Sequence, residues 1–251
     1  MVFVLSASGA VKQPLTINAS DLLHRSEYQL RGKTLEAKLE LTVVRGAQKR
    51  ILKFNLWSEG MTKATVKVTA PTKDRAVAHL RLQDRMWRYD PTIERVISIA
   101  PSMMKQSWMG ADFTNGDLVR NVNLSRHYDH RLVAEETIQV QGTSYRTLKI
   151  ECTPKKEAIV ARGKVNVWID VENAIQLRHE YFNEKGALER TLFFQDVKKF
   201  GDHKLGATLI VRPVGSPKNY TKVEYKEVKF DQDIESSIFT QEFLRKRLQL
   251  P

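Results

Sequence analysis

The chain has 251 residues, of which 41% are hydrophobic and 28% charged, a composition ordinary for a folded domain and unlike that of a disordered chain. No apolar run approaches the ~18 residues that a membrane-spanning helix needs, which excludes such a helix. The formal net charge is +12, and residues 31–88 alone carry fourteen Lys or Arg against five acidic residues. Such a basic stretch suits anionic lipid headgroups, nucleic acid or an acidic protein.

The first ten residues, MVFVLSASGA, are apolar and then small. They resemble the end of a secretory signal with a cleavage point after Ala10, although the basic segment that normally begins such a signal is missing. We therefore expect residues 1–12 to be a signal-peptide remnant or a disordered end, and residues 13–251 to form one domain. The single cysteine, Cys152, excludes a disulfide within a monomer, and we expect no N-terminal acyl-cysteine anchor.

A helix is predicted over residues 18–30. Asn18 or Ser20 can cap its start, because a short polar side chain accepts hydrogen bonds from the free N–H groups of the first turn. Leu22 and Leu23 give the helix an apolar side.

Strands are predicted to follow this helix. Apolar and polar residues alternate with a period of two over 35–43, 52–56 and 64–68. Three successive strands with one apolar and one polar face are typical of an antiparallel sheet that buries only one side.

The central stretch 82–118 is rich in aromatic and methionine residues. Trp87 and Tyr89 are two residues apart and share one face of a predicted strand, with Met86 and Arg88 on the other. Residues 101–118 are predicted to form a helical segment, in which Met104 and Trp108, four residues apart, share a face, and in which 113–118 can form a short capped helix.

The remaining segments continue the same pattern. Strands are predicted at 131–140, 145–152, 165–169, 175–182, 188–197, 205–212 and 220–230, with a helical turn at 155–160 and a short helix at 240–248. The fold class is mainly β (α+β): about ten or eleven antiparallel strands in a strongly curved sheet that forms an incomplete barrel, with the helices at 18–30 and 101–118 covering its concave apolar face. These patterns leave open whether the interior is a packed core or a ligand cavity.

Few residues indicate chemistry. His127, Asp129 and His130 lie close in sequence, but no third protein ligand stands at a metal-binding spacing. Cys152 has Glu151 beside it and no basic activator, which favours an inert thiol. Since phosphate-loop, nucleophile-elbow and zinc-protease motifs are missing, we expect no catalytic residues, no metal and no cofactor.

The sequence does resemble a known family. Residues 86–91 (MWRYDP) and 95–118 (RVISIAPSMMKQSWMGADFTNGDL) are similar to the larger members of the outer-membrane lipoprotein-sorting, or LolA-like, family. Segments 163–170, 191–197 and 230–240 look like downstream strands and the tail of the same family, so the resemblance covers nearly the whole chain. Trp108 stands where the family pattern has Phe, and Ala111 stands where it has Ser.

The resemblance implies a periplasmic, non-enzymatic, monomeric carrier. It would bind lipoprotein acyl chains or another lipid in a hydrophobic cavity, exchange them with inner- and outer-membrane transport partners, and deliver them towards the outer membrane. The residues proposed to form the cavity or its lid are Trp87, Tyr89, Met103, Met104, Trp108, Met109, Phe113, Leu22 and Leu23. Arg88 and Arg95 flank this region and are candidates for contact with a headgroup or for locking the lid.

Two other functions stay open. The first is a non-catalytic interaction module of the cell envelope with a filled core, which uses its basic face to bind an acidic protein; taken singly, each aromatic residue fits such a core. The second, a nucleic-acid binder, is disfavoured because the basic residues alternate with apolar ones along strands and do not cluster in a recognition element.

Overall fold

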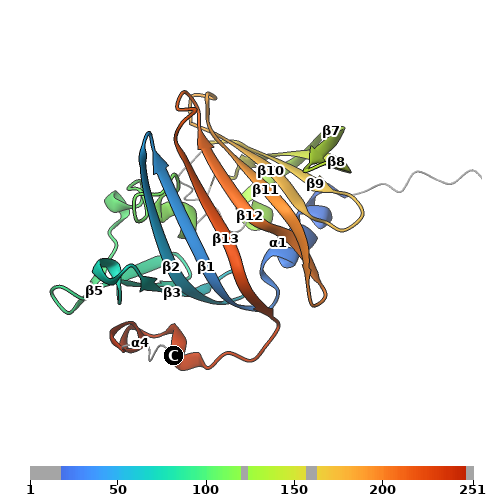
Figure 1. Cartoon of the computed structure of the whole chain (residues 1–251). Coiled ribbons are helices and arrows are strands. Elements are labelled where there is room, and N and C mark those ends of the chain that lie inside the picture. Colours follow the sequence, from blue (N-terminus) through green and yellow to red (C-terminus); the bar gives the residue numbers. More distant parts are fainter. Residues whose placement is uncertain (1–17, 120–123, 157–162, 247–251) are drawn as a thin grey trace, which may run out of the picture.

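The computed structural model describes residues 18–119, 124–156 and 163–246. In these ranges thirteen strands form one antiparallel sheet that is not closed into a barrel (Figure 1). The strands are β1 (Thr34–Arg45), β2 (Gln48–Glu59), β3 (Lys63–Ala70), β4 (Ala78–Leu82), β5 (Arg85–Asp90), β6 (Arg95–Ser98), β7 (Tyr128–Val140), β8 (Thr143–Pro154), β9 (Val165–Asp170), β10 (Gln176–Phe182), β11 (Leu188–Phe200), β12 (His203–Pro213) and β13 (Tyr220–Phe230). The helices are α1 (Ala19–Arg31), α2 (Asn115–Val119), α3 (Leu124–His127) and α4 (Gln241–Arg245), with 3₁₀ turns at η1 (Thr72–Asp74), η2 (Pro101–Met103) and η3 (Ser236–Phe239).

The order of the strands explains how the sheet is covered. It runs β6-β5-β4-β3-β2-β1-β13-β12-β11-β10-β9-β8-β7, so neighbouring strands follow one another in sequence everywhere except at the β1–β13 seam. The two edge strands, β6 and β7, are consecutive in the chain. Because the chain between them starts at one edge and ends at the other, it has to cross the open side of the curved sheet.

Helix α1 lies on the inner side of the sheet, and its predicted start and end are confirmed. The Asn18 side chain accepts hydrogen bonds from two backbone N–H groups of the first turn, at 2.8 and 3.4 Å. Gly32 ends the helix with a φ of 59°, where a Cβ atom would lie only 2.5 Å from a carboxylate oxygen of Asp231. Leu22 and Leu23 are fully buried against residues of β8 and β9.

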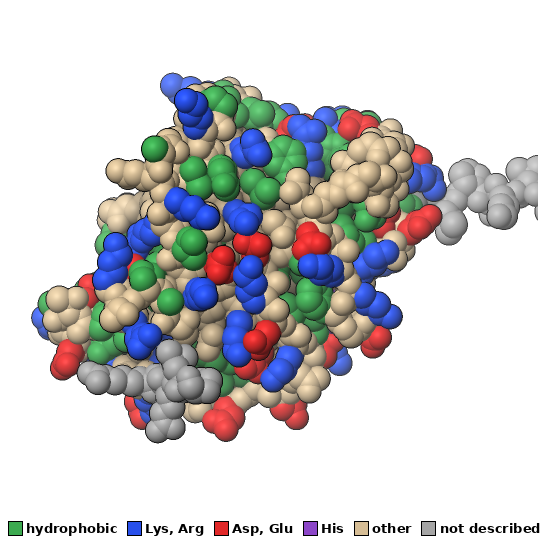
Figure 2. All heavy atoms as spheres, viewed as in Figure 1, with side chains coloured by type: hydrophobic (Ala, Val, Ile, Leu, Met, Phe, Trp, Pro, Cys, Tyr) green, Lys and Arg blue, Asp and Glu red, His purple; other side chains and the backbone are tan. Residues whose placement is uncertain are grey.

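The predicted alternation along β1 is confirmed. Its inward side chains are all buried, namely Leu35, Ala37, Leu39, Leu41 and Val43. The outer face is wet: Lys38 and Glu227 form an ion pair there at 2.8 Å with both side chains more than half exposed. Figure 2 shows basic and acidic side chains interspersed over this face. The basic residues of β1 and β2 are thus partly matched by acidic neighbours.

The end of the chain covers the convex face of β2–β6, the face turned away from α1. After β13, residues 231–246 cross this face, where the Thr65 hydroxyl donates to the Ile238 carbonyl at 2.8 Å. Leu244 of α4 is buried in a cluster with Trp57, Ala78, Leu80, Tyr89 and Phe239. This part of the sheet is therefore covered on both faces.

Two expectations need correction. The described residues form thirteen strands and not about ten or eleven, and β4 is a strand that was not expected. Residues 101–118 do not form a continuous helix, because Met109 and Gly110 have φ values of 53° and 80°, which a right-handed helix excludes. Only η2 and α2 are helical in this segment.

Three further expectations concern the ends of elements. The short capped helix predicted at 113–118 is confirmed as α2, where Thr114 and Asp117 each accept a hydrogen bond from the other's backbone N–H. The terminal helix predicted at 240–248 is present as α4, at 241–245. The signal remnant at 1–12, most of the turn at 155–160 and the end of the chain from residue 247 lie outside the described residues.

Candidate functional site

Residues 101–118, here called the lid segment, lie on the concave face of the sheet. Met104 and Trp108 of the lid segment are buried in the same cluster as the inward residues of β1. The Trp108 ring stacks on Phe113 at 5.5 Å and meets the edge of the Phe54 ring at 5.8 Å, measured between centroids. The lid segment therefore forms part of the core.

The lid segment holds its own shape through short-range hydrogen bonds. The backbone N–H of Trp108 donates to the Phe113 carbonyl at 2.9 Å, and that of Gly116 donates to the Met104 carbonyl at 2.8 Å. These bonds fold the segment back on itself between η2 and α2. The left-handed φ of Gly110 is placed at the tip of this fold, where a residue without a side chain meets least strain.

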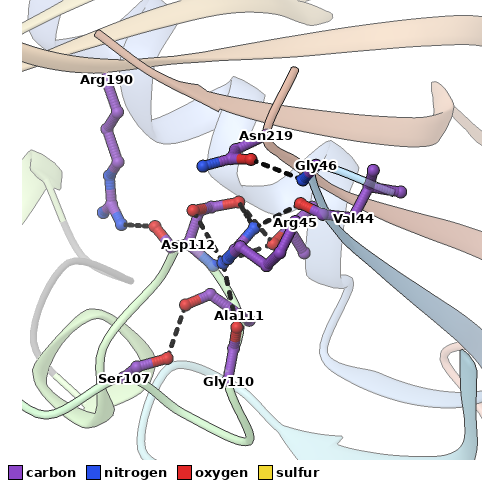
Figure 3. A network of polar contacts seen from close by, with 10 residues as sticks. Val44, Arg45, Gly46, Ser107, Gly110, Ala111, Asp112, Arg190 and Asn219 are labelled. Atoms are coloured by element: carbon purple, nitrogen blue, oxygen red, sulfur yellow. Dashed lines mark hydrogen bonds and ion pairs between the residues drawn. The ribbon is translucent and has the colours of Figure 1, made fainter. Parts of the chain in front are cut away.

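A group of polar contacts, here called the latch, fixes the lid segment to the sheet (Figure 3). Arg45 of β1 donates to the Gly110 carbonyl and forms an ion pair with the Asp112 carboxylate, each at 2.9 Å. The backbone N–H of Asp112 donates to the Thr221 hydroxyl of β13, which in turn donates to the Asp112 carboxylate at 2.7 Å. Arg190 of β11 donates to the Asp112 carbonyl. Three strands thus hold one residue of the lid segment.

A cavity of about 310 Å³ lies between the lid segment, α1 and the concave face. Most of its wall is apolar, with Leu35, Leu39 and Phe54 from β1 and β2, Val211 and Val223 from β12 and β13, and Trp108 and Phe113 from the lid segment. The interior, which the sequence patterns left open, therefore contains an apolar space.

The wall also contains charged side chains. Arg190 forms an ion pair with Asp117 at 2.9 Å, and both side chains are less than 10% exposed. Arg31 and Arg81 line the cavity from α1 and β4, and so does Glu27 of α1. Both oxygens of Glu27 accept hydrogen bonds from Ser125, and burial raises the pKa of this carboxyl.

Two buried histidines belong to the same wall. Burial, with repulsion from Arg88, lowers the pKa of His79 to about 3, and burial, with repulsion from Arg190, lowers that of His179 to about 3. His179 bonds to the Tyr181 hydroxyl through Nδ1 at 3.1 Å. Among the described residues no protein group bonds Nδ1 of His79 or Nε2 of His179. Both rings are therefore neutral at pH 7.

The pKa of these histidines predicts how stability depends on pH. An unfolded histidine titrates near 6.5, so below that pH the unfolded chain binds protons that the folded chain excludes until about pH 3. The free energy of unfolding is expected to fall as the pH drops below 6.5, by up to about 1.4 kcal/mol per pH unit for each histidine. In His179→Gln the slope between pH 6 and 4 should be shallower, as measured by urea denaturation. The same substitution at exposed His24 is the matched control, and equal slopes for wild type and His179→Gln would contradict the prediction.

The structure separates the residues proposed for the cavity or lid. Trp108 and Phe113 line the cavity, Met104 is buried beside it, and Met103 and Met109 are partly buried against the same cluster. Leu22 and Leu23 pack in a different cluster, between α1 and the β7–β9 part of the sheet.

The strand β5 has its two faces in different surroundings. Trp87 and Tyr89 share a face, as expected, but it is the face that the C-terminal segment covers, and neither lines the cavity. Met86 of the other face does line it. Arg88 pairs with Asp90 at 3.3 Å and Arg95 is exposed, so neither of these guanidinium groups is in the cavity wall.

The sequence reasoning missed the arginines that do line the cavity. His79 and Arg81 alternate with Leu80 on β4, and such an alternation normally places the polar residues on the solvent side. Here all three side chains are buried, so the alternation does not tell which face of β4 looks into the cavity. Arg31 follows Glu27 by four residues, a spacing that places both on one side of α1. That spacing is the feature of the sequence from which Arg31 could have been predicted as a neighbour of buried Glu27.

The residues considered for metal binding or catalysis lie in segment 125–130 and at Cys152, and their contacts stabilise the fold. Ser125 bonds to Glu27, and His130 Nε2 lies 3.0 Å from the Leu124 carbonyl. Within the described ranges, no group of three His, Cys, Asp or Glu side chains could hold a metal ion. Cys152 is fully buried, and burial raises the pKa of its thiol, which disfavours the reactive thiolate.

Solved structures share this fold. A DUF1329 family protein from Desulfovibrio piger aligns with a TM-score of 0.82 at 20% identity, over 90% of this chain and 97% of that one. A domain described as an outer membrane lipoprotein-sorting protein, from Vibrio parahaemolyticus, aligns with a TM-score of 0.77 at 20% identity, over 91% and 100%. A LolA superfamily protein from Nitrosomonas europaea aligns with a TM-score of 0.75 at 17% identity, over 90% and 99%. No curated protein sequence matches the chain.

The chain therefore has the same fold as these three proteins, and the resemblance noted in the sequence is confirmed at the level of the fold. A family model with the description "Uncharacterized protein" matches residues 60–246, and the chain belongs to that family. None of the helices in the described ranges combines the length and the apolar character needed to cross a membrane.

Proposed function

We propose that this protein is a periplasmic carrier that binds lipoprotein acyl chains or another lipid in its cavity and delivers them towards the outer membrane. Residues 13–251 act as one domain and as a monomer, without catalysis, and exchange cargo with inner- and outer-membrane partners. The observation that carries the proposal is the apolar cavity beneath the latched lid segment. The fold shared with a domain described as an outer membrane lipoprotein-sorting protein supports the class of cargo.

The size of the cavity defines the mechanism. At about 310 Å³ it is at the lower end of the range of ligand pockets, so a diacyl ligand requires the lid segment to move. Each methylene group that leaves water contributes about 0.8 kcal/mol, whereas a hydrogen bond to a charged group contributes about 1.5–3 kcal/mol. A few methylene groups of the incoming chain therefore offset each bond of the latch. Lid displacement exposes Trp108 and the apolar residues of β1 to the ligand.

The first test is native mass spectrometry of the purified protein, followed by organic extraction and lipid analysis. A reproducible added mass that matches an acyl lipid is expected. Ala64 lines the cavity, so Ala64→Phe should fill part of it and lower uptake of a fluorescent fatty acid at least about threefold, since several methylene groups lose their space. Leu209 of β12 lines the cavity, so its neighbour Thr208 is on the outer face of that strand, and Thr208→Phe, which adds the same ring there, is the matched control.

The opposite result has a clear meaning. A wild-type protein with no added mass and no uptake of the fatty acid would have a filled core. The interaction module that uses its basic outer face to bind an acidic protein would then be the better proposal.

A further inference from the structure

Two arginines of the cavity wall, half-buried Arg31 and buried Arg81, form no ion pair with any described residue. The Arg31 side chain, at the end of α1, makes no hydrogen bond or ion pair with any described residue. Arg81 of β4 is 5% exposed, and the one hydrogen bond that its side chain makes with a described residue is to the Met61 carbonyl, at 2.6 Å. Both guanidinium groups line the same cavity.

These two cations line one cavity, where like charges repel each other. Burial, followed by repulsion from Arg31, lowers the pKa of Arg81 to about 10, and burial lowers the pKa of Arg31. A guanidinium keeps its proton at neutral pH, so both side chains carry a positive charge. Removing a cation from water costs several kcal/mol unless an anion compensates it, and two cations in one apolar cavity add their repulsion to that cost.

The carboxylates of the wall are engaged elsewhere. Asp117 pairs with Arg190, and Glu27 accepts its hydrogen bonds from Ser125. Glu27 attracts Arg31 at a distance without forming an ion pair within 4 Å, so one carboxylate faces two guanidinium groups. The C-terminal end of α1 favours a cation at Arg31, but this helix-dipole effect is smaller than the cost of taking a cation out of water. The contacts within the protein therefore leave an excess of positive charge facing the cavity.

We propose that the cavity binds an amphiphile with an anionic headgroup, which Arg31 and Arg81 hold while the apolar wall holds its chain. A guanidinium matches a carboxylate or a phosphate with two parallel hydrogen bonds, so either group supplies the missing countercharge. This inference rests on the proposed carrier function, because it needs a cavity that takes up lipid. It also distinguishes the preferred ligand from one with an uncharged head.

The test compares three fluorescent probes that share one acyl chain and end in a carboxylate, a phosphate or an uncharged alcohol. The full chain is first freed of co-purified lipid, and each affinity is measured by titration. Wild type should bind at least one anionic probe about tenfold or more tightly than the alcohol, since two charge-assisted contacts are gained. The tighter of the two anionic probes identifies the headgroup chemistry.

The variants assign the effect to the two arginines. In Arg31→Leu/Arg81→Leu the preference for the anionic probe should fall to about twofold or less, while affinity for the alcohol changes little, because only the charged contacts are lost. Arg212→Leu removes an exposed cation of β12 and is the matched control, with the wild-type preference retained. If the double variant does not fold, Arg31→Gln and Arg81→Gln, taken singly, should each reduce the preference.

The outcomes separate this inference from the proposed function. Equal binding of all three probes by wild type would overturn the inference and leave the carrier function in place. Equal loss of the anionic and uncharged probes in folded variants would also overturn it, because the arginines would then only shape the cavity. Failure to bind any probe would overturn both.

Discussion

Replacing Arg190 with methionine is expected to lower the free energy of unfolding by about 3–5 kcal/mol, the usual cost of removing one partner of a buried ion pair. The Asp117 carboxylate, with 8% side-chain exposure, would lose the buried guanidinium with which it pairs. The substitution also removes the hydrogen bond from Arg190 to the Asp112 carbonyl, a contact of the latch. Denaturation with urea, followed by circular dichroism, measures the change.

Two further variants identify the cause of this loss. In Arg190→Met/Asp117→Asn a neutral amide replaces the carboxylate that pairs with Arg190, so part of the lost stability should return. Lys38→Met breaks the exposed pair with Glu227, and a change below about 1 kcal/mol is expected there. An Arg190→Met variant that loses no more stability than Lys38→Met would show that the buried pair does not hold the lid segment.

Trp108→Ala is expected to destabilise the protein by about 3–5 kcal/mol, as large-to-small changes of a buried aromatic residue do. The side chain is 3% exposed and touches the rings of Phe54, His79 and Phe113, so its removal would leave a void that the surroundings fill only in part. Thermal and urea denaturation measure the loss.

Trp108→Phe is the control for this prediction. It keeps an aromatic ring against Phe113 and installs the residue that the LolA-like pattern has at this position, so we expect a loss of less than half that of Trp108→Ala. Equal stability of the two variants would mean that the ring of residue 108 contributes little to the packing of the lid segment.

The sheet was predictable where the local pattern agrees with the tertiary structure. Along β1 one face is buried and the other wet, so the alternation of residue types reports the strand directly. The start and end of α1 were predictable for a similar reason, since Asn18 and Gly32 act within one turn of the helix. The seam between β1 and β13 left no such signal, because it joins segments near opposite ends of the chain.

The candidate site was predictable only in part. The four-residue spacing of Met104 and Trp108 is typical of a helix. Met109 nevertheless turns the chain with a positive φ, which cannot be predicted from a methionine. On β5 the pattern correctly paired Trp87 with Tyr89, but it could not say which face looks into the cavity. Both faces are covered there, one by the lid segment and the other by the C-terminal segment.

The seam between β1 and β13 also determines the order in which the sheet can form. The hairpins on either side of it join neighbours in sequence, so they can form early and at low entropic cost. The pairing of Leu35 with Phe230 closes almost the whole described chain into one loop and has to wait until β13 has been synthesised. Until then β1 is an unpaired edge, the kind of edge that attracts other chains. A nascent chain of this protein therefore stays open, and dependent on protection from aggregation, until its last strand arrives.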